Sequence, residues 1–305
     1  MKRVFISILN FNGKNNTIEC VESLKKINTS GFKSTILVID NGSSEKLDLK
    51  NSSWGDIDLK IIRSEINLGF SGGHNLGFKY IMTQNANYVV VLNNDTYVNG
   101  DFLQKLIGTA DTDDKIGILV PKIYFAPGFE FHKDKYSKKE QGKVFWYAGG
   151  IMDWKNVIGH HRGVDEVDIG QFDKTEETEL ATGCCMMIRR EVLEKVGLFD
   201  DKYYLYYEDS DLNVRTKNAG FKIVYVPKSI IFHKNAGSAG GSGSKLQDYY
   251  ITRNRLLFGM RYAPVRAKVA LFRESLKVLL AGRYWQKRGI IDFYLKRLGR
   301  GSYKI

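Results

Sequence analysis

The strongest pattern in the chain is a series of short apolar runs without polar alternation. The first four runs occupy residues 4–9, 34–39, 59–62 and 88–92. Such runs are typical of strands covered on both faces, as in a parallel sheet between helices. Residues 17–24, between the first two runs, have helical spacing. Strand, helix and strand at this spacing form a βαβ unit, so the pattern predicts an α/β fold with a mostly parallel sheet flanked by helices.

Polar side chains follow these runs at the points where the predicted strands end. Asn10 follows the first run, Asp40 the second, and residues 93–95 (Asn-Asn-Asp) the fourth. Ligands of such sheets bind outside the carboxyl ends of the strands. Amides can hydrogen-bond a nucleotide there, and Asp95 offers a hard oxygen ligand for a divalent cation. Because Asn and Asp are also common turn residues, a simple polar turn is the alternative.

A glycine-rich stretch at residues 67–75 (Asn-Leu-Gly-Phe-Ser-Gly-Gly-His-Asn) follows the third run. We expect it to precede a helix at 75–84. Three glycines in five positions let backbone N–H groups approach a phosphate or nucleotide closely. The spacing is not GxGxxG, which disfavours a dinucleotide site.

The pattern loosens in the middle of the chain. A helix at about 100–110 and a strand at 116–121 are predicted first, and residues 121–179 then indicate an insertion or hairpin region. In this region, the adjacent His160 and His161 cannot share one face of a strand, so we expect a surface loop rather than a joint metal site. Further elements are predicted at 179–188 (strand), 190–196 (helix), 221–227 (strand) and 230–233 (strand).

An acidic cluster follows the aromatic-rich segment 200–207. Residues 208–211 (Glu-Asp-Ser-Asp) place three carboxylates at a predicted helix start. The helix dipole and capping explain part of this clustering. Burial beside aromatic side chains and neighbouring negative charges also raise a carboxylate's pKa toward the range of a general base. His233 ends the last apolar run and is either a core histidine or one that faces a site.

Composition excludes several classes of protein. With 305 residues and 43% hydrophobic content, the chain can bury one large α/β core plus an appendage, or two domains. Its three cysteines, two of them adjacent at Cys184 and Cys185, form neither a disulfide framework nor a zinc motif. A reducing, cytoplasmic setting fits best. The first apolar run is too short for a secretory signal, and no stretch is long enough to span a membrane.

The net charge of +12 resides in the C-terminal part of the chain. Residues 244–305 contain fifteen Lys and Arg against three acidic residues, which leaves residues 1–243 neutral overall. A neutral body with a basic tail indicates an anionic partner such as lipid head groups, a polyphosphate or nucleic acid.

The basic tail is predicted to be helical. Its apolar residues near one helical face are Val265, Val269, Phe272, Leu276 and Leu279, and cations surround them. Such a helix suits a membrane interface. Packing of its apolar side on the rest of the protein is the alternative. We expect a cytoplasmic protein that is either free or peripheral on the inner face of the cell membrane.

Taken in order, these motifs resemble family 2 glycosyltransferases of the GT-A (Rossmann-like) fold, in the rhamnosyltransferase-like branch of bacterial polysaccharide assembly. The matching segments are residues 7–12, 40–43, 67–70 with His74 and Asn75, 92–95, Gly183 with the strand after it, 208–212, His233, and Tyr249-Tyr250 with Arg253-Asn254. No single motif is specific, but the ordered set is, and it covers roughly residues 4 to 258.

The resemblance implies a role for each matching residue. It assigns nucleotide-sugar binding to Asn10, Asp40, Asn67, Gly69, His74, Asn93 and Asn94. Asp40 would accept a hydrogen bond from a pyrimidine ring, and Asp95, with His233 as second ligand, would hold Mg²⁺ or Mn²⁺ against the diphosphate. Asp209 of the Glu208-Asp209 pair would be the catalytic base. Two departures stand out, since Asn93-Asn94 replaces a commoner acidic pair and His74 stands where relatives often carry Arg.

The implied reaction is an inverting, metal-assisted transfer of a sugar from a UDP- or dTDP-sugar to a hydroxyl of a glycan or lipid-linked glycan. The implied division is a catalytic domain at 1–243, with a nucleotide-binding half at about 1–120 and an acceptor-side half at 121–243, and a basic helical extension at 244–305 that can meet an anionic membrane surface. No nucleic acid partner is expected.

Two alternatives remain. A sugar nucleotidyltransferase could use the same sheet and metal, but it would carry a Gly-rich, Arg- or Lys-bearing loop after the first strand, which residues 10–13 (Asn-Phe-Asn-Gly) lack. A non-catalytic protein that binds a nucleotide or polyanion would use the basic tail as its working part.

Overall fold

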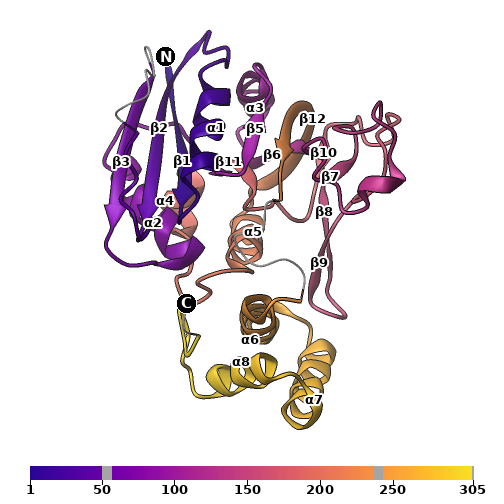
Figure 1. Cartoon of the computed structure of the whole chain (residues 1–305). Helices are drawn as coiled ribbons and strands as arrows, with labels where there is room; N and C mark the ends of the chain where they lie inside the picture. Colours follow the sequence, from indigo (N-terminus) through magenta and orange to yellow (C-terminus); the bar gives the residue numbers. More distant parts are fainter. Residues whose placement is uncertain (50–56, 236–242, 304–305) are drawn as a thin grey trace.

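A computed structural model describes residues 1–49, 57–235 and 243–303. Ten strands of these residues form one mixed sheet, which helices flank (Figure 1). The order of the sheet is β10-β12-β6-β11-β4-β1-β2-β3, with β5 paired to β12 and β7 to β6. The predicted fold class, an α/β fold with a mostly parallel sheet, is confirmed.

The N-terminal half of the chain has the expected order of strands and helices along the sequence. Its elements are β1 (Lys2–Asn10), α1 (Lys14–Leu24), β2 (Phe32–Asn41), β3 (Asp58–Ser64), α2 (Gly69–Met82) and β4 (Tyr88–Asn93). Strand β1 pairs in parallel with both β2 and β4, and β2 pairs in parallel with β3. In β4, residues 89–92 are fully buried because both faces of the sheet are covered. The uninterrupted apolar run therefore corresponds to a central strand of the sheet.

The second half adds strands of both directions. Its elements are β5 (Thr96–Val98), α3 (Phe102–Ala110), β6 (Ile116–Phe125), β7 (Phe145–Tyr147), β8 (Gly150–Asp153), β9 (Ile158–His161), β10 (Glu176–Glu177), β11 (Cys185–Arg189), α4 (Arg190–Val196), α5 (Glu208–Asn218) and β12 (Lys222–His233). Strand β11 runs antiparallel between β4 and β6. The expected division at about residue 120 falls within β6, so both halves share one sheet.

Three expected boundaries differ from the observed ones. Helix α2 begins at Gly69 rather than at residue 75, so the glycine-rich stretch lies in the helix and not before it. Residues 179–184 are a loop, and the strand begins at Cys185. The runs at 221–227 and 230–233 form one strand, β12, whose register shifts between Val226 and Ile230.

The C-terminal extension contains α6 (Lys245–Tyr262), α7 (Val265–Ala281) and α8 (Tyr284–Tyr294). Figure 1 shows these three helices grouped together, with α6 next to α5. A hydrophobic cluster joins Leu256, Phe258 and Leu271 of the extension to Val157 and Tyr203 of the preceding domain. The extension thus packs on the preceding residues through α6. In the described part of the chain, no helix is both long and apolar enough to cross a bilayer.

Candidate active site

The polar residues at the carboxyl ends of β1, β2 and β4 lie at one edge of the sheet, as their pairing requires. Asn10 pairs with Asp40, and Leu9 pairs with Asn93. The Asn10 amide donates to Oδ1 of Asp40 at 3.3 Å, and its oxygen accepts from the Thr17 hydroxyl at 2.9 Å. Asn10 therefore connects the first two strand ends with α1.

Asp40 is buried and has several partners. Its carboxylate accepts from the N–H groups of Leu47 and Ser43 and forms an ion pair with Arg63 of β3. Burial raises the pKa of this carboxyl, but the hydrogen bonds from Ser43 and Leu47 and the Arg63 guanidinium outweigh burial, so the pKa lies below its usual value. Asp40 is thus an anion at neutral pH. Sequence reasoning missed Arg63, which no local pattern distinguishes.

Asp95 and His233 come together although they lie far apart in the chain. Oδ1 of Asp95 is 3.1 Å from Nε2 of His233, because β5 and β12 pair antiparallel at Thr96 and His233. Both side chains are largely buried. Nδ1 of His233 is buried without a hydrogen-bond partner, while the edge of the Trp146 ring lies against the imidazole.

These two side chains fit a divalent cation that also binds substrate. Oδ1 of Asp95 and Nε2 of His233 face each other and would supply part of a coordination sphere. No group of three His, Cys, Asp or Glu residues arranged for a metal occurs in the described residues, so phosphate oxygens would have to complete the sphere.

The two asparagines before Asp95 are engaged locally. The Asn94 amide donates to the Thr17 hydroxyl at 3.0 Å, so it faces the turn after β1. The Asn93 backbone donates to the Cys184 carbonyl at 2.9 Å, and its own carbonyl accepts from the Thr96 hydroxyl at 2.7 Å. The Asn94 side chain thus links the end of β4 to the start of α1. The Asn93 backbone links the end of β4 to the turn before β11.

Asp209 lies in the first turn of α5 and lines a cavity of about 230 Å³. Its Oδ2 accepts from the Gly183 N–H at 3.0 Å, and its Oδ1 accepts from the Ser210 N–H at 2.6 Å. Burial raises the pKa of Asp209 above the usual value, although these hydrogen bonds oppose the shift. A partly buried carboxylate of raised pKa beside a cavity has the properties of a general base.

Glu208, expected beside Asp209 as a catalytic residue, does not line this cavity. Its side chain is only 4% exposed, and Oε2 is buried without a hydrogen-bond partner. Burial, followed by the negative charge of Asp209, raises the pKa of Glu208 well above its usual value. Of the two carboxyl groups, Asp209 alone faces the space where a substrate would bind.

Aromatic and small side chains from distant segments form the cavity wall. The lining residues besides Asp209 include Tyr147, His161, Thr182, Tyr206, Tyr207 and Ile251. His160 is exposed while His161 lies in this wall, so the two alternate as strand neighbours must, but the expected surface loop is wrong for His161. Burial lowers the pKa of His161 to about 4, and the imidazole is neutral. Apart from Asp209 and its neighbours, sequence reasoning missed this wall.

Trp146 connects the cavity with the Asp95–His233 pair. Its ring lies edge-on to His161, with centroids 4.5 Å apart, and edge-on to His233, at 4.6 Å. The candidate base and the candidate metal ligands therefore belong to one continuous region, with one indole ring between His161 and His233.

His74, to which the resemblance assigns nucleotide-sugar binding, lies inside the protein and not at its surface. This side chain is fully buried in α2 and hydrogen-bonds the Ser7 hydroxyl at 2.9 Å. Burial lowers its pKa to about 3, so the imidazole carries no charge for a phosphate. Phe70 and Phe78 flank it at helical spacing. That spacing in the sequence was the available signal of a buried helical face.

The glycines of α2 allow close packing against neighbouring segments. Gly69 has φ of +74°, and a Cβ there would lie 2.4 Å from the Tyr204 carbonyl oxygen. A Cβ on Gly73 would lie 2.4 Å from Cδ1 of Leu9. Asn67 accepts from the Gly69 N–H at 2.8 Å and thereby shapes the start of the helix. In this structure Asn67 and Gly69 position α2, and a contact with the nucleotide sugar remains a prediction.

The segment that leads into Asp209 is held by the C-terminal extension. Tyr204, Tyr206 and Tyr207 have φ of 66°, 69° and 73°, a conformation that bulky residues adopt rarely. The Asn254 amide donates to the carbonyls of Tyr203, Leu205 and Tyr206, each at 2.8 Å. The fully buried Arg253 donates to the Tyr203 carbonyl at 2.9 Å. Helix α6 therefore fixes the backbone that positions the candidate base.

The fold, with Asp95 after β4 and Asp209 at the start of α5, is that of the GT-A class. A sequence model described as "Glycosyl transferase family 2" matches residues 5–197, more than half of the chain, so the chain belongs to this family.

Two relatives illustrate the similarity. The "Low-salt glycan biosynthesis hexosyltransferase Agl10" of Haloferax volcanii is 27% identical over 223 residues, which are 72% of this chain and 66% of that protein. The "N-acetylglucosaminyl-diphospho-decaprenol L-rhamnosyltransferase" of Mycobacterium tuberculosis is 42% identical over 59 residues, 19% of each chain. This chain thus aligns with slightly less than two thirds of the first relative.

Two solved structures agree in fold. GalNAc-T7 with UDP, GalNAc and Mn²⁺ has a TM-score of 0.60 at 17% identity, over 97% of this chain and 58% of that one. S. aureus TarS 1-349 in complex with UDP-GlcNAc has a TM-score of 0.59 at 15% identity, over 96% of this chain and 79% of that one. Both likenesses show the GT-A fold.

Proposed function

We propose that this protein is an inverting glycosyltransferase. It moves a hexosyl or rhamnosyl-type sugar from a nucleoside-diphosphate donor to a hydroxyl acceptor bound in the cavity beside Asp209. The observation that carries the proposal is the raised-pKa carboxylate of Asp209 in that cavity, one indole ring away from the Asp95–His233 pair.

The donor nucleotide would bind at the ends of β1 and β2. Asn10 and the Asp40–Arg63 pair offer hydrogen-bonding groups to a base and ribose, with Asn93 and Asn94 next to the diphosphate. The complexes of GalNAc-T7 with UDP and of TarS with UDP-GlcNAc support a UDP- or dTDP-sugar, whereas a third structural neighbour is a mannosyltransferase in complex with GDP-Man and Mn²⁺. The nucleotide therefore has to be determined by experiment.

Asp95 and His233 would hold Mg²⁺ or Mn²⁺ at the diphosphate, where the ion would neutralise charge on the leaving group. The imidazole favours Mn²⁺, because Mg²⁺ takes oxygen ligands almost exclusively. The Mn²⁺ in the complexes of GalNAc-T7 and of the mannosyltransferase agrees with this choice.

Asp209 would accept the proton of the acceptor hydroxyl as the acceptor oxygen bonds to the anomeric carbon and the nucleoside diphosphate departs. No protein nucleophile takes part, so the single displacement inverts the anomeric configuration. Tyr206, Tyr207 and the neutral His161 would orient the acceptor and exclude water from the reacting atoms.

The acceptor would be a glycan hydroxyl, either free or linked to a lipid. The name of the mycobacterial relative, which contains a diphospho-decaprenol, supports a lipid-linked acceptor. The basic extension supports a peripheral position on an anionic membrane surface, where such acceptors reside.

A product assay tests the proposal. The purified chain is incubated with UDP-, dTDP- and GDP-sugars, Mn²⁺ and an N-acetylglucosaminyl-diphospho-polyprenol, and the anomeric configuration of the product is read by NMR. Release of a nucleoside diphosphate with inversion is expected. In a parallel incubation with a nucleoside triphosphate and a sugar 1-phosphate, release of pyrophosphate would indicate the nucleotidyltransferase instead. Binding without turnover in both incubations would indicate a non-catalytic nucleotide-binding protein.

A further inference from the structure

Helix α7 has an apolar surface on the side that does not pack on the protein. Its inner face, with Ala267, Leu271 and Ser275, is buried against α6 and α8. A second row of apolar residues at helical spacing is exposed, and we name it the α7 stripe: Val265 (76% exposed), Val269 (46%), Phe272 (47%), Leu276 (47%) and Leu280 (83%). Single exposed apolar residues are ordinary, but five along one helical face indicate a contact surface.

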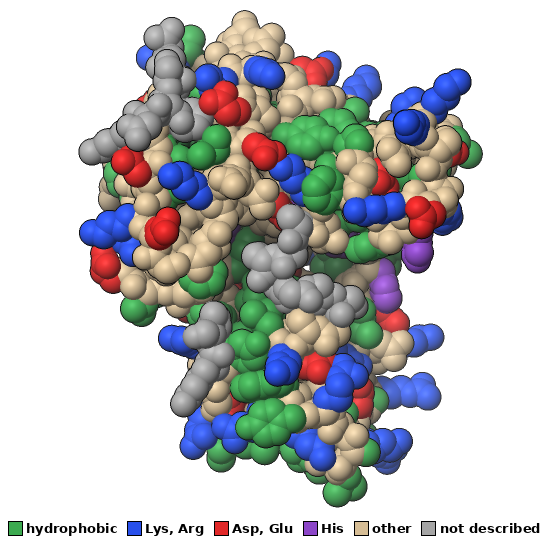
Figure 2. Space-filling view, in the orientation of Figure 1, with side chains coloured by type: hydrophobic (Ala, Val, Ile, Leu, Met, Phe, Trp, Pro, Cys, Tyr) green, Lys and Arg blue, Asp and Glu red, His purple; other side chains and the backbone are tan. Residues whose placement is uncertain are grey.

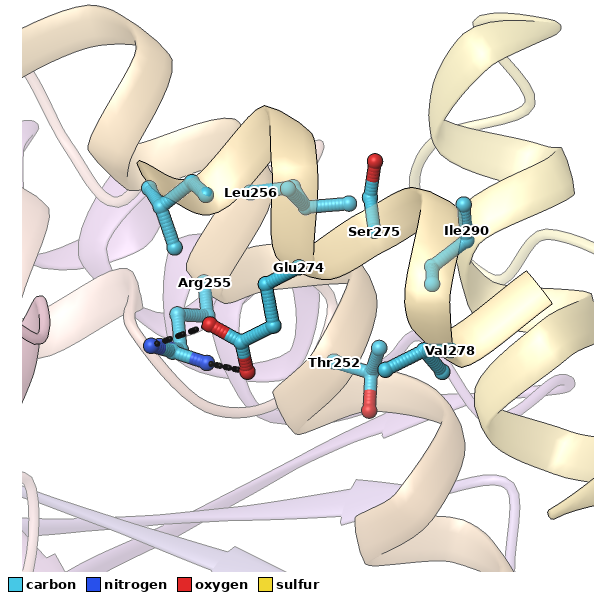
Figure 3. A pocket seen from close by; sticks show the side chains of 8 residues that line it. Thr252, Arg255, Leu256, Glu274, Ser275, Val278 and Ile290 are labelled. Carbon is cyan, nitrogen blue, oxygen red and sulfur yellow. Dashed lines mark hydrogen bonds and ion pairs between the residues drawn. The ribbon is translucent and has the colours of Figure 1, made fainter. Parts of the chain in front are cut away.

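The inner face of α7 offers no room for a ligand. Figure 3 shows the hollow between α6, α7 and α8, in which Arg255 and Glu274 form two hydrogen-bonded ion contacts. Its volume of about 20 Å³ holds one water molecule at most. Any partner of α7 therefore meets the outer face, which carries the stripe.

The charged residues that border the α7 stripe are all basic. By helical position, Arg266, Arg273 and Lys277 lie along one side of it and Lys268 lies on the other. The structure shows no ion pair for these four side chains among the described residues, and the one acidic residue of α7, Glu274, lies on the opposite side, paired to Arg255. Figure 2 shows basic side chains interspersed with hydrophobic ones over the C-terminal helices.

We propose that the α7 stripe docks the protein on an anionic lipid surface. Phe272 and Leu276 enter the boundary between headgroups and acyl chains, and Arg273 and Lys277 contact the headgroups. This geometry is that of an interfacial amphipathic helix, whose binding combines apolar burial with attraction to anionic lipid. The inference rests on the proposed function in one respect, since it assumes that the acceptor is lipid-linked.

A second copy of the chain fits this surface less well than lipid does. Two stripes packed face to face would bring the bordering cations of both copies together, and like charges across an interface are unfavourable. An anionic bilayer supplies both the apolar phase and the counter-charge that the stripe lacks.

Docking through α7 would place the membrane close to the candidate active site. Helix α7 packs on α6, and Ile251 of α6 lines the cavity beside Asp209. Figure 1 shows α6 between α5 and the other two C-terminal helices. A sugar attached to a membrane lipid would thus need to reach past one helix to the base.

The test is co-sedimentation of the full chain with vesicles of phosphatidylcholine alone or mixed with phosphatidylglycerol. We expect binding to the mixed vesicles only, weakening as salt is raised. The double variant Phe272→Ser, Leu276→Ser should bind at least about tenfold more weakly, because it removes the two central apolar side chains. Its matched control is Ile66→Ser, Ile169→Ser, which alters two exposed isoleucines outside the extension and should bind as the unaltered chain does.

A charge variant, Arg273→Glu, Lys277→Glu, should also lose binding, whereas its control, Lys138→Glu, Lys139→Glu, should keep it. Because all of these side chains are exposed, an unchanged melting temperature is expected and separates docking from folding. Equal binding by the stripe variant and the unaltered chain, or no binding by the unaltered chain, would overturn the proposal. A dimer that the stripe variant converts to a monomer, with no vesicle binding, would assign the stripe to self-association instead.

Transfer to a water-soluble acceptor gives the separate readout for the proposed function. The stripe variant should keep that activity. Vesicle binding by a chain that transfers no sugar would leave the docking inference standing while removing the proposed function.

Discussion

The backbone N–H of Gly183 donates a 3.0 Å hydrogen bond to Oδ2 of Asp209. The carbonyl of the next residue, Cys184, accepts from the N–H of Asn93 at 2.9 Å. One turn before β11 therefore ties the candidate base to the end of β4, two residues before Asp95. On the side of the turn, this link uses backbone groups of Gly183 and Cys184, so it depends on one side chain alone, that of Asp209 itself.

Asp209→Asn tests the base. The amide oxygen can still accept from Gly183, so the fold is expected to persist, but the amide cannot take a proton. We expect transfer to fall by about 10²–10⁴-fold, the usual contribution of general base catalysis. The measurement is nucleoside diphosphate release, with Asp134→Asn, an exposed carboxylate elsewhere, as control. Near-normal transfer in Asp209→Asn would remove this residue from the mechanism.

The pH dependence of transfer follows from the same carboxylate. Burial raises the pKa of Asp209 above the usual 3.8, and the base works only when ionised. We therefore expect kcat/KM to decrease as the pH falls through the raised pKa, with an inflection above 3.8, and to be level at higher pH until another group titrates. The acidic limb should be missing from the residual activity of Asp209→Asn. An unchanged limb in that variant would assign it to another group.

Asp95→Ala is expected to abolish metal-dependent transfer and leave the fold intact. With Asn93 and Asn94 in place of acidic residues, Asp95 is the one carboxylate at the end of β4. His233→Gln should raise the Mn²⁺ concentration for half-maximal rate by at least about tenfold, since it removes a ligand and leaves a neutral amide. The measurement is a Mn²⁺ titration of transfer after EDTA treatment, with His160→Gln as control. Transfer by the unaltered chain that EDTA does not affect would contradict both expectations.

The set of polar residues at the edge of the sheet was predictable because local patterns in the sequence mark it. Buried strands appear as apolar runs, and the polar residues that end them meet wherever parallel strands share an edge. Asn10, Asp40 and Asn93 are neighbours for this reason.

The rest of the candidate site depends on contacts between segments that lie far apart in the chain. A single sequence does not show such contacts. The cavity wall joins His161 of β9 to Tyr206 and to Ile251 of α6, and Arg63 meets Asp40 across paired strands. The glycine-rich stretch did not show its packing role, because in a sequence glycine indicates close packing and phosphate binding equally well. What decides between them is the Tyr204 backbone against Gly69, a contact across more than a hundred residues.

The buried His74 predicts a loss of stability in acid. Its folded-state pKa is about 3, against 6.5 for the ordinary imidazole. Between these values the unfolded chain binds a proton that the folded chain does not, so stability falls as the pH drops below 6.5. The expected contribution is about 3 kcal/mol between pH 7 and pH 4. Urea unfolding at several pH values should show a shallower dependence for His74→Phe than for the unaltered chain, whereas the control His160→Gln should keep the full slope.

Asn254→Ala tests whether α6 supports catalysis. The Asn254 amide donates to the carbonyls of Tyr203, Leu205 and Tyr206. Its loss leaves the part-buried carbonyls of Leu205 and Tyr206 without this donor, at a cost of about 1–3 kcal/mol, while the Tyr203 carbonyl keeps its bond from Arg253. The left-handed conformations of Tyr206 and Tyr207 are themselves unfavourable and persist only while the surroundings hold them. Release of this segment would displace Asp209 at the start of α5. We therefore expect a melting temperature several degrees lower and, well below that temperature, a reduced kcat with a nearly unchanged KM for the donor, which binds at the other strand ends.

The control for Asn254→Ala is Asn218→Ala, an exposed asparagine at the end of α5, which should change neither quantity. A variant that melts earlier but keeps its kcat would show that Asn254 contributes to stability alone. The other outcome is a kcat that falls together with the melting temperature while the circular dichroism spectrum at the assay temperature stays unchanged. This result would show that the C-terminal extension helps to position the base, in addition to any contact of α7 with lipid.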